Sequence, residues 1–149
     1  MRVRFHTARV RFFFDKLRRG HNSPSMWPVA RAIYYSFVLD NFRRQGYPEK
    51  WAPLESSTIA RRRKGKGSGS PKILMDTGIL RAAASSQAGG GYVKTTSRQM
   101  EIGTNLSYAG YHHEGTPQMP RRRFYTFDDP LLARMAAAIQ SQALRAAYH

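Results

Sequence analysis

The sequence predicts an α+β fold in which a small antiparallel sheet is packed by a long helix in the N-terminal half and by a C-terminal helix. Two amphipathic helical patterns, over 26–45 and 131–146, and two short alternating segments, at 92–96 and 99–103, carry this prediction. The length of 149 residues and the hydrophobic content of 41% fit a single domain spanning 1–149.

The first 20 residues are predicted to form a basic strand followed by a basic helix. Residues 2–7 alternate polar and apolar side chains, as a strand with one buried face does. From Ala8 to about Arg19 the apolar residues recur at helical spacing: Val10, Phe13, Phe14 and Leu17.

The helix over 26–45 is expected to be the principal core element. Ser25 can cap it, Pro28 is tolerated in its first turn, and Gly46 ends it. Its apolar face comprises Val29, Ile33, Tyr34, Phe37, Val38 and Phe42. An aromatic stripe of this kind is far more often core than a cofactor site, so we expect no cofactor.

The stretch after this helix combines an apolar anchor at Trp51–Leu54 with a strongly basic arm. The arm carries five positive charges, on Arg61, Arg62, Arg63, Lys64 and Lys66. The glycines and serines of Gly65–Ser70 cannot bury enough surface to order themselves, so a flexible basic loop is predicted over 60–71. Asp76 or Thr77 then caps a short helix through Leu80 and Ala83.

The second half of the chain begins with an antiparallel hairpin over 92–103. We expect Asn105 to cap a short helix that ends at Gly115, 116–120 to be extended, and 121–127 to form a last strand. Asp128 caps the final helix, with Pro130 in its first turn. The apolar face of that helix comprises Leu131, Leu132, Met135, Ile139, Ala143 and Ala146.

The charge balance is the most unusual property of the composition, with 25 Lys and Arg against 9 Asp and Glu, formally +16. Such a surplus implies acidic or polyanionic neighbours, either nucleic acid or protein. The chain has no cysteine, which excludes disulfides and thiolate chemistry. No apolar run approaches the roughly 20 residues of a membrane span, and the N-terminus lacks a secretory pattern, so we expect a soluble intracellular product.

No motif supports catalysis or metal binding. His112, His113 and Glu114 are adjacent in sequence, but neighbouring histidines point to different sides of a helix and no second ligand motif exists. The carboxylates of Asp76, Asp128 and Asp129 are explained as helix caps. Gly65–Ser70 lacks the spacing of a phosphate-binding loop. We therefore expect a protein that is not an enzyme.

The basic segments are the candidate contact sites, for a neighbouring subunit or for DNA. The candidate residues are Arg61, Arg62, Arg63, Lys64, Lys66, Arg121, Arg122, Arg123 and Phe124. Phe124 and Tyr125 beside the triplet could stack on bases, but no motif for sequence-specific readout accompanies them. A solvated face without a partner is the competing interpretation of these charge runs.

The order of the motifs resembles the virion morphogenesis proteins of tailed bacteriophages, of the tail-completion or neck group found in Mu-like phages and prophages. The resemblance covers about residues 2–145. It rests on Trp51–Leu54 after a long helix, the basic arm, Ile73–Arg81, Met100–Asn105, Tyr108–Ala109, His112–Gly115 and Pro120–Phe124. The usual P-x-R-P-F of this family appears here as Pro120-Arg-Arg-Arg-Phe124, without the second proline.

The resemblance implies a structural, non-enzymatic subunit of the virion, assembled in the host cytoplasm. Such subunits form homo-oligomeric rings, here expected to be hexamers, that complete the tail and allow head–tail joining and DNA passage. The implied partners are neighbouring neck, connector and tail-tube proteins, with non-specific contact to genomic DNA in the lumen and no membrane. The residues do not determine whether the chain is an adaptor, stopper, neck or terminator layer.

Two other classes remain as alternatives. A basic nucleic-acid-binding or packaging accessory protein would bind duplex DNA as a monomer, in a strongly salt-dependent manner. A phage-encoded enzyme such as a nuclease is disfavoured, because the sequence offers no suitable cluster of carboxylates or histidines.

Overall fold

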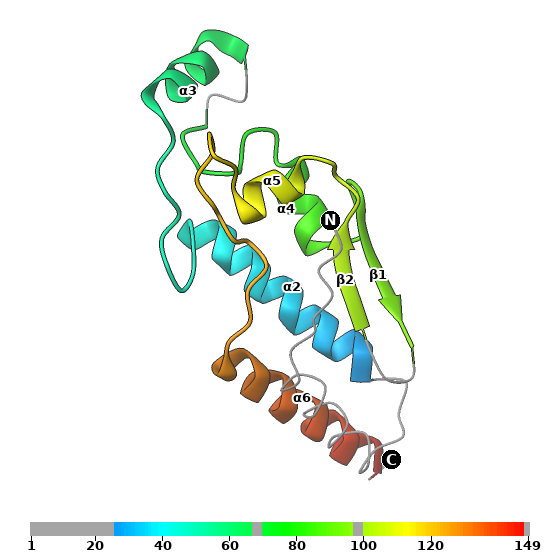
Figure 1. Cartoon of the computed structure of the whole chain (residues 1–149). Coiled ribbons are helices and arrows are strands. Elements are labelled where there is room, and N and C mark those ends of the chain that lie inside the picture. Colours follow the sequence, from blue (N-terminus) through cyan, green and yellow to red (C-terminus); the bar gives the residue numbers. More distant parts are fainter. Residues whose placement is uncertain (1–25, 67–69, 97–99, 148–149) are drawn as a thin grey trace.

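The computed structural model describes residues 26–66, 70–96 and 100–147, and a long helix, α2 (Met26–Arg44), runs through its centre (Figure 1). Helix α6 (Asp129–Ala147) packs along one side of α2, and the short helix α4 (Ile79–Ser85) packs on the other side, against the hairpin. The predicted α+β class is confirmed. The strand and helix predicted within 1–20 lie outside the described residues.

Helix α2 confirms the predicted principal core helix, although its buried face is rotated from the expected one. Tyr34, Val38 and Phe42 are buried as predicted, whereas Phe37 is only half-buried. The remaining buried positions include Met26, Trp27, Ala30 and Asn41. The face is rotated because it must contact α6 as well as α4, which flank α2 on different sides.

The end of α2 depends on Gly46, as the sequence predicted. Gly46 has a φ of +116°, a region that side chains rarely allow. A Cβ at this position would lie 2.4 Å from both the Glu49 carbonyl oxygen and the Trp51 backbone nitrogen. The chain reverses tightly here, with the Trp51 amide donating to the Gln45 carbonyl oxygen at 2.9 Å.

The predicted antiparallel hairpin is confirmed as β1 (Gly91–Thr95) and β2 (Met100–Thr104). Its register pairs Tyr92 with Gly103, Val93 with Ile102 and Thr95 with Met100. Ile102 is 1% exposed and carries the hairpin into the hydrophobic core. The ring of Tyr92 covers Gly103, where a Cβ would lie 2.5 Å from the ring.

The helix after the hairpin starts later than predicted. Helix α5 runs from Ala109 to Glu114, and Asn105 does not cap it. The residues before α5 form a turn in which the Leu106 amide donates to Thr104 Oγ1 at 3.2 Å. The predicted end at Gly115 is confirmed, with a φ of +79°.

The predictions for the two segments between α5 and α6 are wrong. Thr116 and Met119 form a closed reverse turn, with amide-to-carbonyl bonds of 2.9 and 3.1 Å, where 116–120 was expected to be extended. Residues 121–127 form no strand, and the carbonyl oxygens of Arg123 and Phe124 accept bonds from the Trp51 and Asn41 side chains. Phe124 and Tyr125 are consecutive and both buried, at 0% and 4% exposure.

The start of α6 confirms the predicted cap. The Leu131 amide donates to Asp128 Oδ1 at 2.7 Å. Leu131, Met135 and Ile139 are buried against α2. Among the helices that the structure describes, none is long and apolar enough to cross a membrane.

Candidate functional site

The basic arm is helical rather than a loop through Lys66. Helix α3 (Ser56–Arg61) continues into a single π-helical turn, η1 (Arg62–Lys66), and projects from one end of the molecule (Figure 1). The prediction of a loop over 60–71 is therefore wrong for 60–66. Good helix formers such as Ala60 and the basic residues that follow outweigh the single glycine at position 65. Residues 67–69 lie outside the described part of the chain.

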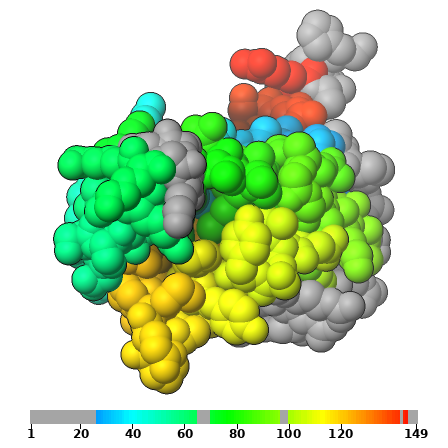
Figure 2. Space-filling view, turned by 90° about the horizontal axis from the view of Figure 1, so that it is seen from above, coloured from blue at the N-terminus to red at the C-terminus, as the bar shows by residue number. Residues whose placement is uncertain are grey.

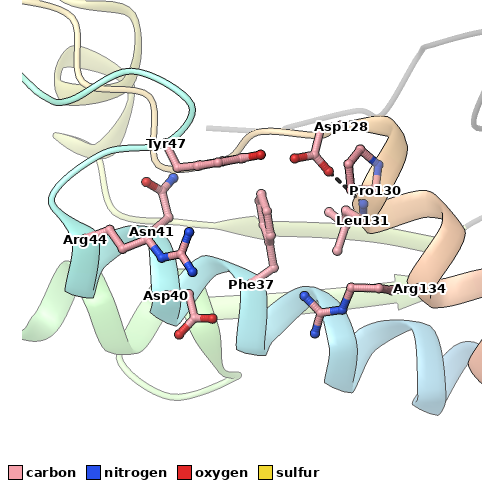
Figure 3. A pocket seen from close by; sticks show the side chains of 9 residues that line it. All are labelled: Phe37, Asp40, Asn41, Arg44, Tyr47, Asp128, Pro130, Leu131 and Arg134. Atoms are coloured by element: carbon pink, nitrogen blue, oxygen red, sulfur yellow. Dashed lines mark hydrogen bonds between the residues drawn. The ribbon is translucent and has the colours of Figure 1, made fainter.

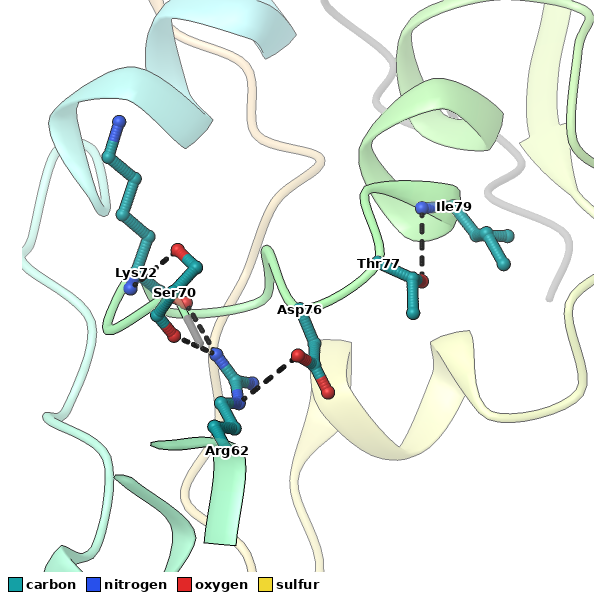
Figure 4. Close-up of polar contacts among 6 residues, drawn as sticks. All are labelled: Arg62, Ser70, Lys72, Asp76, Thr77 and Ile79. Carbon is teal, nitrogen blue, oxygen red and sulfur yellow. Dashed lines mark hydrogen bonds and ion pairs between the residues drawn. The ribbon is translucent and has the colours of Figure 1, made fainter. Parts of the chain in front are cut away.

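Arg62 holds this arm against the body, although the sequence suggested a contact role for it. Its side chain is buried, and Nη1 donates to the carbonyl oxygens of Ser70 and Lys72 at 2.9 and 3.0 Å (Figure 4). Its Nε lies 3.7 Å from Asp76 Oδ1. Asp76 therefore contacts Arg62 and does not cap α4, whose N-cap residue is Gly78. Of the two predicted caps, Thr77 lies at the helix start, where its Oγ1 accepts from the Ile79 amide at 3.5 Å (Figure 4).

Arg122 forms a second internal clamp at the other end of the arm. It is 6% exposed, and its Nε and Nη2 donate to the carbonyl oxygens of Ala52 and Pro53 at 3.0 and 2.9 Å. The pKa of Arg122 is lowered by burial and then by the nearby positive charge of Arg62. Two guanidinium groups thus lie close together beneath the arm and bind main-chain carbonyls from both of its ends.

The rest of the basic triplet is divided between surface and core. The Arg121 and Arg123 side chains are exposed, while Phe124 is fully buried. The carbonyl oxygen of Arg123 accepts a bond of 2.9 Å from Trp51 Nε1. Because Arg62, Arg122 and Phe124 are internal, their proposed contact with a partner or DNA does not fit their burial.

Five of the candidate contact residues are exposed, namely Arg61, Arg63, Lys64, Arg121 and Arg123. The side chain of Lys66 lies outside what the structure describes. In the space-filling view, the arm forms a lobe beside the body, and the turn at 116–119 projects near it (Figure 2). The contact role of these exposed side chains stays a prediction.

The adjacent histidines of α5, His112 and His113, pack within the protein. His113 is 6% exposed and packs edge-on against Phe124, with 4.9 Å between ring centroids. Burial lowers the pKa of His113 to about 4, while Glu114 at 3.6 Å opposes this shift. Burial also lowers the pKa of His112, with Arg122 adding to the effect. In the described ranges, no group of three His, Cys, Asp or Glu side chains could hold a metal ion.

A pocket of about 130 Å³ lies where the end of α2 meets the start of α6 (Figure 3). Phe37 and Tyr47 form its aromatic wall, with rings edge-on at 5.8 Å. The pocket is lined by two acidic and two basic side chains, so their formal charges cancel: Asp40, Asp128, Arg44 and Arg134. The Asp40 carboxylate pairs with Arg43 at 2.8 Å, outside the pocket.

Two amide side chains without a role predicted from the sequence connect the end of α2 to the segment after the basic triplet and to the segment after the arm. Asn41 is 1% exposed, and its Nδ2 donates to the Phe124 carbonyl oxygen at 3.1 Å. Gln45 Nε2 donates to the Phe42 carbonyl oxygen at 2.7 Å, and its Oε1 accepts from the Ile73 amide. The signal for Asn41 was present in the sequence, since it is a polar residue on the apolar face of a helix.

The fold and the arm together define a small, strongly basic α+β protein that presents a clamped helical arm at one end. The model of the phage virion morphogenesis family matches residues 10–142, and the chain belongs to this family. It is accordingly a bacteriophage protein with a role in building the virion. No curated protein and no solved structure matches the chain in these comparisons.

Proposed function

We propose that the chain is a structural subunit of the phage neck or tail-completion region. Copies of it assemble into a ring, a hexamer, that finishes the tail and allows head–tail joining and DNA passage. The match to the phage virion morphogenesis family over residues 10–142 is the observation that carries this proposal. The subunit acts by binding and shape, without catalysis, and assembles in the host cytoplasm before joining the virion.

The projecting arm is a structural argument for a role in an assembly. Among the described helices and strands, α3 has its main contacts with η1, and Arg62 and Arg122 bind the segments that follow and precede the arm. A projecting element of this kind can reach a neighbouring protein in an assembly. The exposed cations on the arm are then available to neck, connector or tail-tube proteins.

The positive charge also suits a ring through which DNA passes. Duplex DNA carries one negative charge per roughly 1.7 Å of axis, so an acidic lumen would oppose its passage. Exposed arginines without base-reading geometry give contacts that are independent of sequence. Arg121 and Arg123, on the segment beside the arm, are the side chains that we assign to a protein neighbour or to the lumen.

Electron microscopy of the purified full-length protein tests this proposal. Class averages should show rings of uniform symmetry, and a phage or prophage lacking the gene should produce heads and tails that do not join. A protein that stays monomeric at all concentrations, with normal joining in the deletion, would contradict the proposal.

The second candidate is a basic nucleic-acid-binding or packaging accessory protein, which the net charge of +16 favours. It predicts that the purified monomer binds duplex DNA with an affinity that falls steeply as salt is raised. Titration of a labelled duplex at several salt concentrations, alongside the ring assay, separates the two candidates.

A further inference from the structure

One face of the arm forms an open groove that nothing else in the described residues covers. It is shallow and open to solvent, and it is lined by Ser56, Ile59, Ala60, Arg63 and Lys64. These positions follow the i, i+3, i+4, i+7, i+8 spacing, so they share one face of the continuous α3–η1 helix. Arg62, whose side chain is buried beneath the arm, is not among the residues that line this face.

The groove combines an apolar floor with a cationic end. Ile59 is half-exposed and Ala60 is exposed, while Arg63 and Lys64 stand one turn further on. Neither cation has a hydrogen bond or ion pair with another described residue. An apolar floor contributes nothing to the binding of a phosphate backbone, whereas it suits a side chain flanked by carboxylates.

The carboxylates of a second copy of this chain are poor candidates to bind in the groove. Only nine acidic residues exist in the whole sequence. Most of those in the described ranges already have a partner within the subunit: Asp40, Asp76, Glu101, Glu114 and Asp128. Charge complementarity therefore points to a different protein and away from a second copy of this one.

We infer that this groove on the arm binds an acidic segment of a neighbouring virion protein, which places an apolar side chain on Ile59 and Ala60 and carboxylates on Arg63 and Lys64. The inference rests on the proposed function, since it assigns the arm to a partner protein of the assembled neck. It divides the cations of the arm by role: Arg62 holds the arm in place, and Arg63 with Lys64 recognises the partner.

The probe for this inference is a short helical peptide with glutamates on one face and leucines on the other, labelled for fluorescence anisotropy. It should bind the full-length protein, and the double variant Arg63→Glu with Lys64→Glu should weaken binding by about tenfold or more. Ile59→Asp should also weaken it, and polyglutamate without leucines should bind less well than the peptide. Arg61→Glu, the same charge reversal as Arg63→Glu but at an exposed position outside the groove, should have a much smaller effect than Arg63→Glu alone.

Equal losses from Arg61→Glu and Arg63→Glu, or no loss from Ile59→Asp in a variant with unchanged circular dichroism, would overturn the inference. Tighter binding of a duplex oligonucleotide through the same residues would assign the groove to DNA instead. The ring assay is independent of the peptide. Rings without groove-dependent peptide binding would refute the groove alone, whereas groove-dependent binding without rings would refute the proposed function.

Discussion

The indole Nε1 of Trp51 donates a hydrogen bond of 2.9 Å to the carbonyl oxygen of Arg123, 72 residues further along the chain. This bond joins the anchor before the arm to the basic segment beside α2. Trp51 also packs edge-on against Phe42, with 5.3 Å between ring centroids. One side chain thus connects the principal helix, the root of the arm and the basic triplet.

Trp51→Phe is expected to reduce the free energy of unfolding by about 2 kcal/mol. Roughly 1 kcal/mol comes from the lost hydrogen bond, and the rest comes from the space left by the smaller ring. Urea denaturation measures this loss, with Tyr111→Phe as the control because Tyr111 is 60% exposed. A loss below about 0.5 kcal/mol for Trp51→Phe would show that the bond is unimportant.

Arg122→Met is expected to cost about 2 kcal/mol, since it leaves the carbonyl oxygens of Ala52 and Pro53 without their donor. Arg123→Met removes an equal charge from an exposed position and should stay within about 0.5 kcal/mol of the wild type. Thermal and urea unfolding of both variants provide the comparison. Similar losses in the two variants would contradict the internal role of Arg122.

Arg62→Gln should loosen the arm without unfolding the body. Its two bonds to the carbonyl oxygens of Ser70 and Lys72 join the start of η1 to the segment that follows the arm. Limited trypsin digestion followed by mass spectrometry should then show faster cleavage after Arg61, Arg63 and Lys64. Arg81→Gln, at an exposed position in α4, is the matched control. In assembled rings, the wild-type arm should be cut more slowly than in the free subunit.

The buried imidazole of His113 predicts a loss of stability in acid. Its pKa falls from 6.5 to about 4 on folding, so between these values the unfolded chain takes up the proton more readily. The contribution is complete above about pH 6.5 and is lost as the pH falls towards 4, by up to about 3 kcal/mol. His113→Phe should flatten the dependence of unfolding free energy on pH in this window. An unchanged slope in the variant would exclude His113 as the source.

Phe42→Ala is expected to cost roughly 3–5 kcal/mol, because Phe42 is fully buried between Trp51 and Phe124. Phe37→Ala should cost less, about 1–2 kcal/mol, because Phe37 is half-buried beside the pocket. Urea denaturation of the two variants tests the rotation of the α2 face. Equal losses of unfolding free energy in the two variants would support the buried face of α2 that the sequence predicted, with Phe37 in the core.

The periodic elements could be predicted because their signals are local. The extent of α2, the cap that Asp128 gives α6, and the alternation of the hairpin each depend on neighbouring residues. The arm was predicted as a loop because glycine and serine after Lys64 outweighed the helix formers before it. The strand predicted at 121–127 is absent, and the burial of both Phe124 and Tyr125 depends on distant residues that their own sequence does not reveal.

The internal roles of Arg62 and Arg122 could not be predicted from the sequence. Both stand in runs of basic residues, where a solvated or contact role is the usual one. Their acceptors are main-chain carbonyls of Ala52, Pro53, Ser70 and Lys72, which every residue possesses and which therefore leave no pattern. Only the path of the backbone brings these acceptors together.

The reverse turn at 116–119 offers a place for a label. Its two cross-bonds close the loop at Thr116 and Met119, and the intervening Pro117 and Gln118 are exposed. An epitope inserted between these two residues should leave the closure intact, since loop tips tolerate insertions. Gold-tagged antibody against such an epitope would then mark, on micrographs of whole particles, which layer of the virion contains this subunit.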